Sequence, residues 1–249
     1  MATELKRAAV VTGGAAGIGL EIVRHLARDG MSVVAIDWNR GACAQAEKSF
    51  RKDDRVRFIV GDISRPEGAQ LAIQTAIDAF GRLDLLCNNA AVHPLEVIED
   101  HAFETWNQTF QVNVNGTMLC SQMALPHMKR QKSGAIVNIG SISGLVPYAG
   151  GGAYAASKAA IMMLTKVLAL EAGPYGVTVN CICPGSIRTE AGRGTQPEEI
   201  PTHIPVRRYG KPADVAHLVL YLASEAASYM TGSVIVLDGG ATAGRSRQR

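Results

Sequence analysis

The sequence predicts a doubly wound α/β fold in a single domain, with about seven parallel strands and helices on both faces of the sheet. Short runs rich in Val and Ile alternate with longer segments whose apolar residues recur with the 3.6-residue period of a helix. Such alternation implies right-handed βαβ units and a parallel sheet. No linker, repeat or low-complexity segment divides the chain, so residues 1–249 form one predicted domain.

Each predicted strand is a short apolar run of the kind that is buried on both faces. The predicted strands are Ala8–Thr12, Ser32–Asp37, Val56–Val60, Leu83–Asn88, Ala135–Gly140, Val177–Cys183 and Val234–Leu237. Helical periodicity follows the first strand, at residues 18–26, and the third, at residues 69–80. Longer helices are expected over Glu104–Lys129, Ala153–Ala172 and from Pro212 to about Ala223.

A glycine-rich turn joins the first predicted strand to the first predicted helix. The segment Thr12–Gly19 reads TGGAAGIG and leads directly into the helical pattern. Gly13, Gly17 and Gly19 let the backbone turn sharply. The free N–H groups at the start of the helix, which include those of Ala16 and Ile18, attract phosphate. The turn therefore predicts a diphosphate site typical of a Rossmann fold.

The end of the second strand favours NAD over NADP. Asp37 lies eighteen residues beyond Gly19, where a carboxylate accepts hydrogen bonds from both hydroxyls of an adenosine ribose and repels a 2′-phosphate. An NADP site would have Arg or Lys there or beside the glycines, where this chain has Ala15 and Ala16. Arg40 is close enough to help a phosphate, but Asp37 opposes it.

Tyr154 and Lys158 lie four residues apart on a predicted helix, with Ser141 thirteen residues before the tyrosine. Residues four apart share a helix face, and a neighbouring cation lowers the pKa of a phenol, ordinarily near ~10. A serine hydroxyl aimed at the same point can hold a carbonyl or carbinol oxygen. The trio suits proton transfer to and from a secondary alcohol. Taken alone, Y-x-x-x-K is a weak motif and is more typical of an ordinary Ala-rich helix.

Several motifs in one order resemble the short-chain dehydrogenase/reductase family, in its compact branch of about 250 residues. They are TGxxxGIG (12–19), Asp62 after the third strand, NNAA (88–91), Asn113, Ser141, YxxxK (154–158), PGxIxT (184–189) and a late DGG (238–240). The similarity runs nearly end to end. It implies that Ser141, Tyr154, Lys158 and Asn113 are catalytic, with Asn115 as the alternative to Asn113, which would bend its helix and hold a water linking Lys158 to solvent.

The resemblance also implies the cofactor contacts. The adenine would meet Asp62 and Ile63, Asn89 would steady the sheet beside the cofactor, and Lys158 would bind the nicotinamide ribose next to Tyr154. A clamp over the nicotinamide is expected from Pro184, Gly185, Ile187 and Thr189. The chain departs from the family in having Ala91 where a glycine is usual, one added methyl group near the nicotinamide ribose.

The implied reaction is hydride transfer between NAD(H) and the carbinol or carbonyl carbon of a small secondary alcohol or ketone. The predicted lid, residues 184–206, is short and polar, which suggests a sugar, polyol or cyclic diol; His93, Ser143 and Glu190 are candidate substrate contacts. Two alternatives stay open: an NADP-dependent 3-oxoacyl-type carbonyl reductase, and a non-catalytic NAD-binding regulatory protein.

Composition argues against other classes of function. The net charge of +3 is spread along the chain apart from a basic tail (residues 244–249), so neither nucleic acid nor a membrane is an expected partner. Five cysteines without metal-site spacing predict free buried thiols and no metal. The start, MATELKR, has no signal-peptide character, so a cytoplasmic location is expected. The family resemblance suggests a homotetramer.

Overall fold

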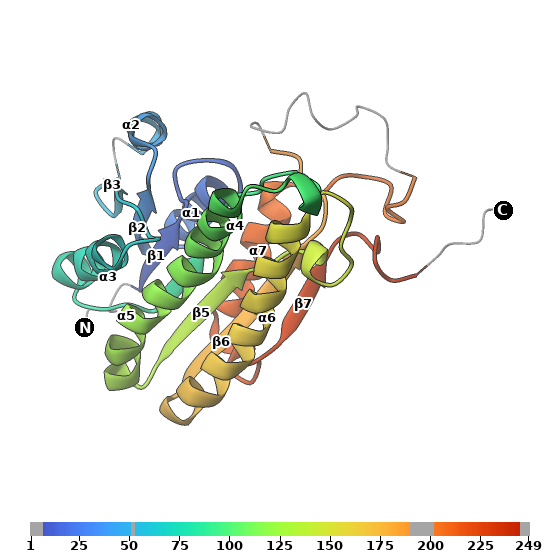
Figure 1. Cartoon of the computed structure of the whole chain (residues 1–249). Coiled ribbons are helices and arrows are strands. Elements are labelled where there is room, and N and C mark those ends of the chain that lie inside the picture. Colours follow the sequence, from blue (N-terminus) through green and yellow to red (C-terminus); the bar gives the residue numbers. More distant parts are fainter. Residues whose placement is uncertain (1–6, 51–52, 190–201, 245–249) are drawn as a thin grey trace.

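The computed structural model describes residues 7–50, 53–189 and 202–244. Its strands form one parallel seven-stranded sheet in the order β3-β2-β1-β4-β5-β6-β7 (Figure 1). The strands are β1 (Ala8–Thr12), β2 (Ser32–Asp37), β3 (Val56–Val60), β4 (Leu85–Asn88), β5 (Gly134–Ile139), β6 (Val177–Pro184) and β7 (Val234–Leu237). The predicted doubly wound fold is confirmed, with strand ends within two residues of those expected.

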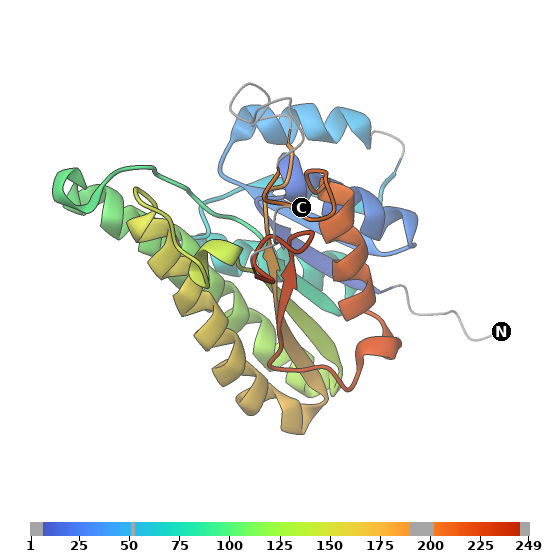
Figure 2. The same cartoon turned by 90° about the vertical axis from the view of Figure 1, so that its right-hand side faces the viewer.

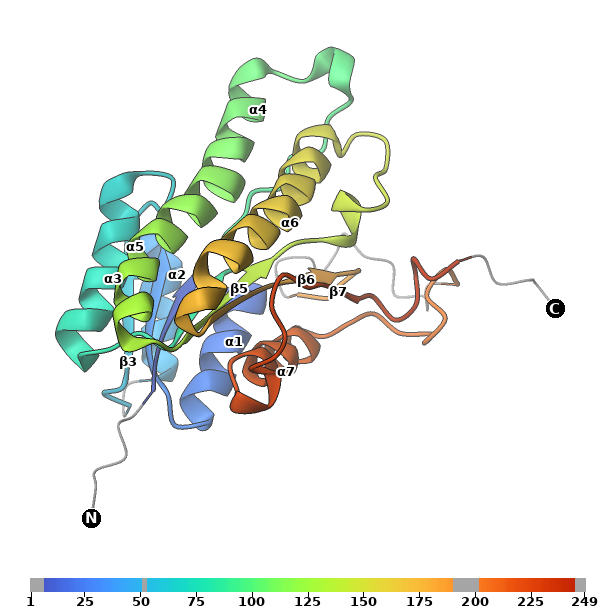
Figure 3. The same ribbon diagram turned by 90° about the horizontal axis from the view of Figure 1, so that it is seen from below.

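Helices cover both faces of the sheet (Figure 3). One face carries α3 (Pro66–Phe80), α5 (Gly116–Gln131) and α6 (Gly152–Ala172), and the other carries α1 (Gly17–Arg28) and α7 (Pro212–Leu222). Figure 2 shows the sheet from the side, with the green and gold helices α5 and α6 on one side and the blue α1 and orange-red α7 on the other. Short 3₁₀ turns complete the connections: η1 (Ile98–Asp100), η3 (Ile142–Gly144), η4 (Gly173–Tyr175) and η5 (Glu225–Ala227).

Alternate residues of the central strands contribute to two hydrophobic cores, one on each face of the sheet. Ala9 and Val11 of β1 point toward Ile22 of α1, while Val10 between them packs with Ile73 of α3. Each of these side chains is buried, which explains why the strands read as continuous apolar runs and not as alternating ones.

Two helical features differ from expectation. The predicted helix over 104–129 is α4 (Phe103–Phe110) and α5 joined by a π-helical turn at Gln111–Asn115. A further helix, α2 (Arg40–Ser49), was not predicted, because it buries only Cys43 and Ala46 and so has no clear apolar period. Its start does carry a signal, since the Asn39 side chain accepts a hydrogen bond from Ala42 N (3.0 Å) and caps the helix.

The apolar character of α6 comes from its place in the core. The segment Gly152–Tyr175 is long and apolar enough to cross a bilayer by length and composition, but half of its most apolar stretch is buried inside the protein. Leu168 and Ala172 pack with Val179 of β6. The five cysteines are buried with free thiols, as predicted.

The order of the strands creates the crevice that a ligand would use. β1 and β4 are neighbours at the centre of the sheet, and the chain leaves β1 toward β2 and β4 toward β5, in opposite directions. At such a switch point the loops after the carboxyl ends of the strands separate and leave room for a ligand. The loops that follow β1, β4, β5 and β6 carry most of the predicted site residues.

Candidate active site

The glycine turn after β1 has the geometry that only glycine permits. Gly13 and Gly17 have φ angles of 61° and 52°, and a Cβ on Gly19 would lie 2.0 Å from the Gly13 carbonyl oxygen. The first intrahelical bond of α1 runs from Leu20 N to Ala16 O (3.1 Å). The N–H groups of Gly17, Ile18 and Gly19 therefore precede the helical ladder at its positive end, where they suit a diphosphate.

Asn89 holds this turn against the end of β4. Its backbone N–H bonds the Thr12 hydroxyl (3.0 Å), and its side-chain Nδ2 bonds the carbonyl oxygens of Thr12 (3.0 Å) and Gly13 (3.1 Å). The amide donors are thus used to fix the cradle, so Asn89 acts on the cofactor site through the position of Gly13.

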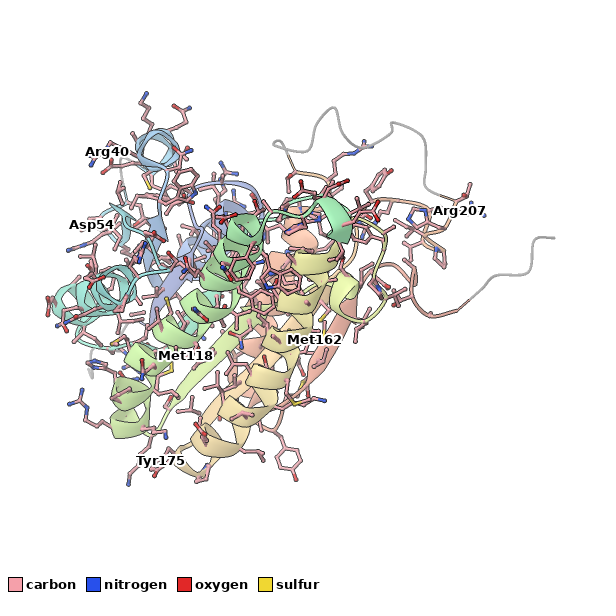
Figure 4. All side chains as sticks on the ribbon, viewed as in Figure 1. Arg40, Asp54, Met118, Met162, Tyr175 and Arg207 are labelled. Atoms are coloured by element: carbon pink, nitrogen blue, oxygen red, sulfur yellow. The ribbon has the colours of Figure 1, made fainter. Side chains whose placement is uncertain are left out.

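Asp37 projects from the carboxyl end of β2 toward the same turn. Its carboxylate accepts hydrogen bonds from Ala15 N (3.3 Å) and Asn39 N (3.0 Å), which hold the two oxygens at the rim of the crevice. Arg40, at the start of α2 (Figure 4), is exposed to solvent. A negative charge fixed beside the glycine turn suits ribose hydroxyls and opposes a 2′-phosphate.

Two more predicted cofactor residues follow β3. The Asp62 carboxylate accepts a hydrogen bond from Ser64 N (2.9 Å) through one of its two oxygens. The Ile63 side chain is buried against α5, where a Cβ on Gly116 would lie 2.0 Å from Ile63 Cδ1. Ile63 therefore anchors the Asp62 loop to the helix that begins near Asn113.

The segment after β6 closes the crevice from the opposite side. Gly185, which follows Pro184, bonds Leu237 O through its N–H (3.0 Å), and Ile187 pairs with Gly210. Thr189 reaches the glycine turn, since a Cβ on Gly17 would lie 3.7 Å from Thr189 Cγ2. The predicted clamp and the predicted phosphate cradle thus face each other.

Three of the four predicted catalytic residues, Ser141, Tyr154 and Lys158, line one cavity of about 620 Å³ between the crevice and the surface. It is bounded by the loops after β4, β5 and β6 and by the start of α6. Its walls include the residues Ile18, Asn89, Ala91, His93, Ser141, Ser143, Tyr148, Tyr154, Lys158, Pro184, Gly185 and Ile187. The structure therefore brings together Ser141, Tyr154, Lys158 and two of the candidate substrate residues.

Lys158 does not lower the pKa of Tyr154 in this arrangement, contrary to the expectation from spacing. Its ammonium donates to Ile139 O (2.7 Å) and lies over the Tyr154 ring, 5.5 Å from the ring centre. Burial raises the pKa of Tyr154, and a hydrogen bond with Ser141 partly opposes that rise. Burial lowers the pKa of Lys158 to about 8.

His93 lines the cavity and its ring nitrogen already has a hydrogen-bond partner. It is therefore a candidate substrate contact and, at the same time, a hydrogen-bonded loop histidine. Its ring lies against the Tyr154 ring, with centroids 4.0 Å apart and an interplanar angle of 32°. Its Nε2 hydrogen-bonds the Tyr148 hydroxyl. Burial, and secondarily the Lys158 charge, lower the pKa of His93, so the ring is neutral at physiological pH.

Asn113 lies in the π-helical turn and is completely buried. Its side chain binds both backbone groups of Val92, accepting from N (2.8 Å) and donating to O (3.0 Å), and donates to Ser157 Oγ (2.9 Å). Ser157 in turn donates to Tyr154 O (2.7 Å). Asn115, in the same turn, is exposed.

Some residues fall outside these observations. Glu190 and most of the predicted lid, residues 190–201, lie outside the described residues, as do residues 245–249 of the basic tail. Sequence reasoning missed Tyr148 and Ser157. Tyr148 stands six residues before Tyr154, next to the Gly150–Gly152 run, and only the folding of that loop over the cavity gives it a role.

The chain is similar over nearly its whole length to characterised oxidoreductases. The family model for short chain dehydrogenases matches residues 7–200. A 3-alpha-(or 20-beta)-hydroxysteroid dehydrogenase of Mycobacterium tuberculosis is 38% identical over 96% of this chain and 90% of its own. Glucose 1-dehydrogenase 2 of Bacillus subtilis is 35% identical over 95% of each chain. The crystal structure of levodione reductase superposes with a TM-score of 0.89 at 28% identity, covering 96% of this chain and 98% of that one.

Proposed function

The chain belongs to the short chain dehydrogenase family, and from that premise we propose that it is an NAD-dependent dehydrogenase of a small secondary alcohol, able to reduce the corresponding ketone. The similar proteins named for hydroxysteroid, glucose and levodione substrates all act on a carbinol or carbonyl carbon, so an oxidoreductase of CH–OH groups is the common activity. The NAD preference and the small substrate are the parts proposed for this chain.

The observation that carries the NAD preference is the fixed carboxylate of Asp37. Its oxygens accept hydrogen bonds from Ala15 N and Asn39 N at the edge of the glycine turn. Positions 15 and 16, where an NADP site would have a basic residue, are both alanine. A 2′-phosphate at this position would be repelled by the Asp37 carboxylate, which these hydrogen bonds hold in place. Ribose hydroxyls would instead find an acceptor already in place.

The residues present fit a nicotinamide cofactor. A side chain at Gly13, Gly17 or Gly19 would strain the turn or fill the cradle, and the open N–H groups of Gly17, Ile18 and Gly19 supply diphosphate donors. Asp37 and Asp62 would hold the adenosine end, and Ile187 and Thr189 the nicotinamide end. When bound, the cofactor supplies the acceptor or donor of the hydride.

The chain's own residues supply proton transfer and positioning. Tyr154 takes the hydroxyl proton of the alcohol or returns it to the ketone oxygen, and Ser141 orients that oxygen by a hydrogen bond. Lys158 places a positive charge over the Tyr154 ring, and such a charge favours the phenolate when it lies close to the hydroxyl. Asn113 fixes the loop that carries Val92 and His93, which forms one wall of the cavity.

The test is a cofactor comparison on the purified protein. Reduction of NAD⁺ and NADP⁺ is measured with the same panel of secondary alcohols at alkaline pH. We expect kcat/KM for NAD⁺ to exceed that for NADP⁺ by about tenfold or more, because one unfavourable contact of about 1.4 kcal/mol already gives that ratio. Equal use of both cofactors, or a preference for NADP⁺, would contradict the proposal and favour the carbonyl-reductase alternative.

We further propose a cytoplasmic homotetramer. Support comes from the outer face of α6, where Met163, Val167 and Leu170 are exposed, and from the partly exposed Met118 of α5 (Figure 4). Exposed apolar residues along two adjacent helices suit burial against a second copy of the chain. Light scattering coupled to size exclusion tests this, and a mass of one subunit (26.4 kDa) at micromolar concentration would contradict it.

A further inference from the structure

A second hydroxyl lies beside the catalytic serine at the end of the cavity. Ser143 Oγ is 3.1 Å from Ser141 Oγ, and Ser143 N donates to Ser141 Oγ at 3.1 Å. Both serines are buried and both line the cavity that contains Tyr154. The site thus offers two hydroxyls about one hydrogen-bond length apart, although proton transfer to one substrate oxygen requires only Ser141.

The second hydroxyl continues into a row of polar groups. Burial raises the pKa of the Tyr148 hydroxyl, Ser143 is close enough to that hydroxyl to oppose the rise, and both residues line the cavity. The Tyr148 hydroxyl bonds His93 Nε2. The His93 ring then returns to the reaction centre by lying against the Tyr154 ring at 4.0 Å. We call Ser143, Tyr148 and His93 the polar row. It occupies one side of the cavity, and Leu95, Ile142 and Val146 give the neighbouring wall an apolar surface.

Backbone bonds hold the two loops of the polar row together. Glu96 N donates to Gly150 O (2.8 Å), and Glu96 pairs with Gly151 in a parallel bridge. The loop after β4 that carries His93 is fixed a second time, through Val92, by Asn113. The polar row therefore has a defined position before any substrate binds, which is the condition for recognising a group by geometry.

We propose that the polar row binds a second substrate oxygen on the carbon next to the reacting carbinol, so that the substrates are vicinal diols and their α-hydroxy ketones. This inference rests on the proposed function, since it places the reacting oxygen at Ser141 and Tyr154. The neighbouring oxygen then falls at Ser143 and Tyr148, because two gauche oxygens on adjacent carbons are separated by about the same distance as the two serine hydroxyls. A lone alcohol would use only half of this arrangement.

The polar row suits either oxidation state of the second oxygen. Serine and tyrosine hydroxyls both donate and accept, and a neutral histidine can present a donor or an acceptor at Nε2. The three groups also interact with one another, so a substrate that lacks the second oxygen leaves none of them without a polar partner. We therefore expect kcat/KM for a diol to exceed that for the matching mono-alcohol by about 10- to 100-fold. A ratio of about 10⁴ is typical of sites where a buried polar group loses its hydrogen-bond partner.

The experiment compares kcat/KM with NAD⁺ for matched alcohols. Cyclohexane-1,2-diol is compared with cyclohexanol, which lacks the second oxygen, and with 2-methylcyclohexanol, which keeps the size of the substituent without its polarity. Butane-2,3-diol and butan-2-ol form a second, acyclic pair. We expect each diol to exceed its mono-alcohol by about tenfold or more, and 2-methylcyclohexanol to behave like cyclohexanol.

Variants assign the preference to the polar row. Ser143→Ala and Tyr148→Phe should each reduce the diol-to-mono-alcohol ratio by about tenfold. One control accompanies them. Tyr175→Phe removes a tyrosine hydroxyl in the exposed turn η4, just after the carboxyl end of α6 (Figure 4) and far from Tyr154 at the start of that helix. This control should not change the ratio.

The possible results separate this inference from the proposed function. A wild-type ratio near one, an unchanged ratio in both polar-row variants, or equal preference for 2-methylcyclohexanol and the diol would each overturn the inference while alcohol oxidation still stands. Turnover of other secondary alcohols but of neither diol would overturn it as well. Lack of turnover with every alcohol and both cofactors would contradict the proposed function itself.

Discussion

The ammonium of Lys158 lies over the ring of Tyr154 and is hydrogen-bonded to the backbone of β5. Nζ lies 5.5 Å from the ring centre and donates to Ile139 O at 2.7 Å. Lys158 is buried and Tyr154 is half-buried, and burial acts on them in opposite directions, raising the pKa of the phenol and lowering that of the ammonium to about 8. The two groups are thus adjacent, but burial has the larger effect on each pKa.

Replacing Tyr154 by Phe should abolish turnover and leave the fold and cofactor binding intact. The phenol lies in the cavity next to Ser141, where it can exchange a proton with an oxygen that Ser141 holds. Loss of a general acid/base lowers kcat by about 10²- to 10⁴-fold. Steady-state kinetics measure the loss, and quenching of protein fluorescence by NADH measures cofactor affinity.

The matched control for this prediction is Tyr175→Phe, which removes a hydroxyl on the exposed 3₁₀ turn η4. It should retain wild-type kinetics. If the Tyr154→Phe protein kept a tenth or more of wild-type kcat, the catalytic assignment would be wrong.

Replacing Lys158 by Met should change how stability depends on pH. The pKa of Lys158 is about 8 in the folded protein and about 10.4 when unfolded, so between these values the unfolded chain holds more protons. Wild-type stability must therefore gain from rising pH, and that gain is absent from the variant. From pH 7 to 9.5 the free energy of unfolding of wild type should rise by about 2 kcal/mol relative to the variant.

Urea unfolding of both proteins at several pH values measures that difference. Groups remote from Lys158 titrate equally in both proteins, so they cancel, and His93, whose pKa the Lys158 charge lowers, is already neutral in this range. The loss of the bond to Ile139 O adds a constant offset, which is why the slope with pH is the informative quantity. A difference that stays constant across this range, or that changes in the opposite direction, would show that Lys158 does not titrate as proposed.

The parts of the site that were predictable from sequence are those set by residues close together in the chain. The glycine turn, Asp37 at the end of β2 and the Tyr154–Lys158 pair each depend on one element and its immediate neighbours. The direction in which Lys158 points was not predictable, since its partner is the backbone of Ile139 on β5. The partnership of His93 with Tyr148 also escaped, because 55 residues separate them and only the packing of two loops joins them.

Asn113 shows the same limit in a different form. Its position before VNG indicated a role in the site, but its three side-chain bonds reach Val92 and Ser157, which lie 21 and 44 residues away. The helix α2 escaped for an energetic reason, since Cys43 and Ala46 bury too little apolar surface to produce a period. Capping by Asn39, a local signal, was the better guide there.

Replacing Asp37 by Ala should weaken the preference for NAD. The change removes a ribose acceptor and the charge that opposes a 2′-phosphate, so kcat/KM for NAD⁺ should fall by about tenfold and the ratio of NAD⁺ to NADP⁺ efficiency by more. Asp29→Ala removes one negative charge at the far end of α1, from an exposed pair with Arg7, and should leave the ratio unchanged. An unaltered ratio in Asp37→Ala would assign cofactor choice to another residue.

Replacing Gly19 by Ala should damage the cofactor cradle. The new Cβ would lie 2.0 Å from Gly13 O and 2.6 Å from Asn89 Nδ2, so the turn must move or the Asn89 bonds must break. We expect NADH affinity to fall by about tenfold or more and the protein to lose about 1–3 kcal/mol of stability, the usual cost of overpacking. Gly41→Ala, at a helical site with only an ordinary 3.4 Å contact, should be neutral or slightly stabilising. Equal behaviour of the two variants would contradict the cradle.

Replacing Asn113 by Ala should loosen the wall of the cavity that carries His93. The side chain is completely buried and binds both backbone groups of Val92, which would be left without these partners in the variant. Leaving buried polar groups unsatisfied costs about 1–3 kcal/mol each, so the free energy of unfolding should fall by about 2–4 kcal/mol.

The effect of Asn113→Ala on catalysis should follow from the same loosening. Val92, which Asn113 holds, directly precedes His93, and the His93 ring lies against Tyr154. Because the change disturbs Tyr154 and not the cofactor cradle, kcat should fall while NADH affinity changes little. Asn115→Ala is the matched control, since it removes an exposed amide from the same π-helical turn and should alter neither stability nor kcat. Denaturation and steady-state kinetics on both variants measure these quantities. If Asn115→Ala were the more damaging of the two, Asn113 would not be the residue that positions this wall.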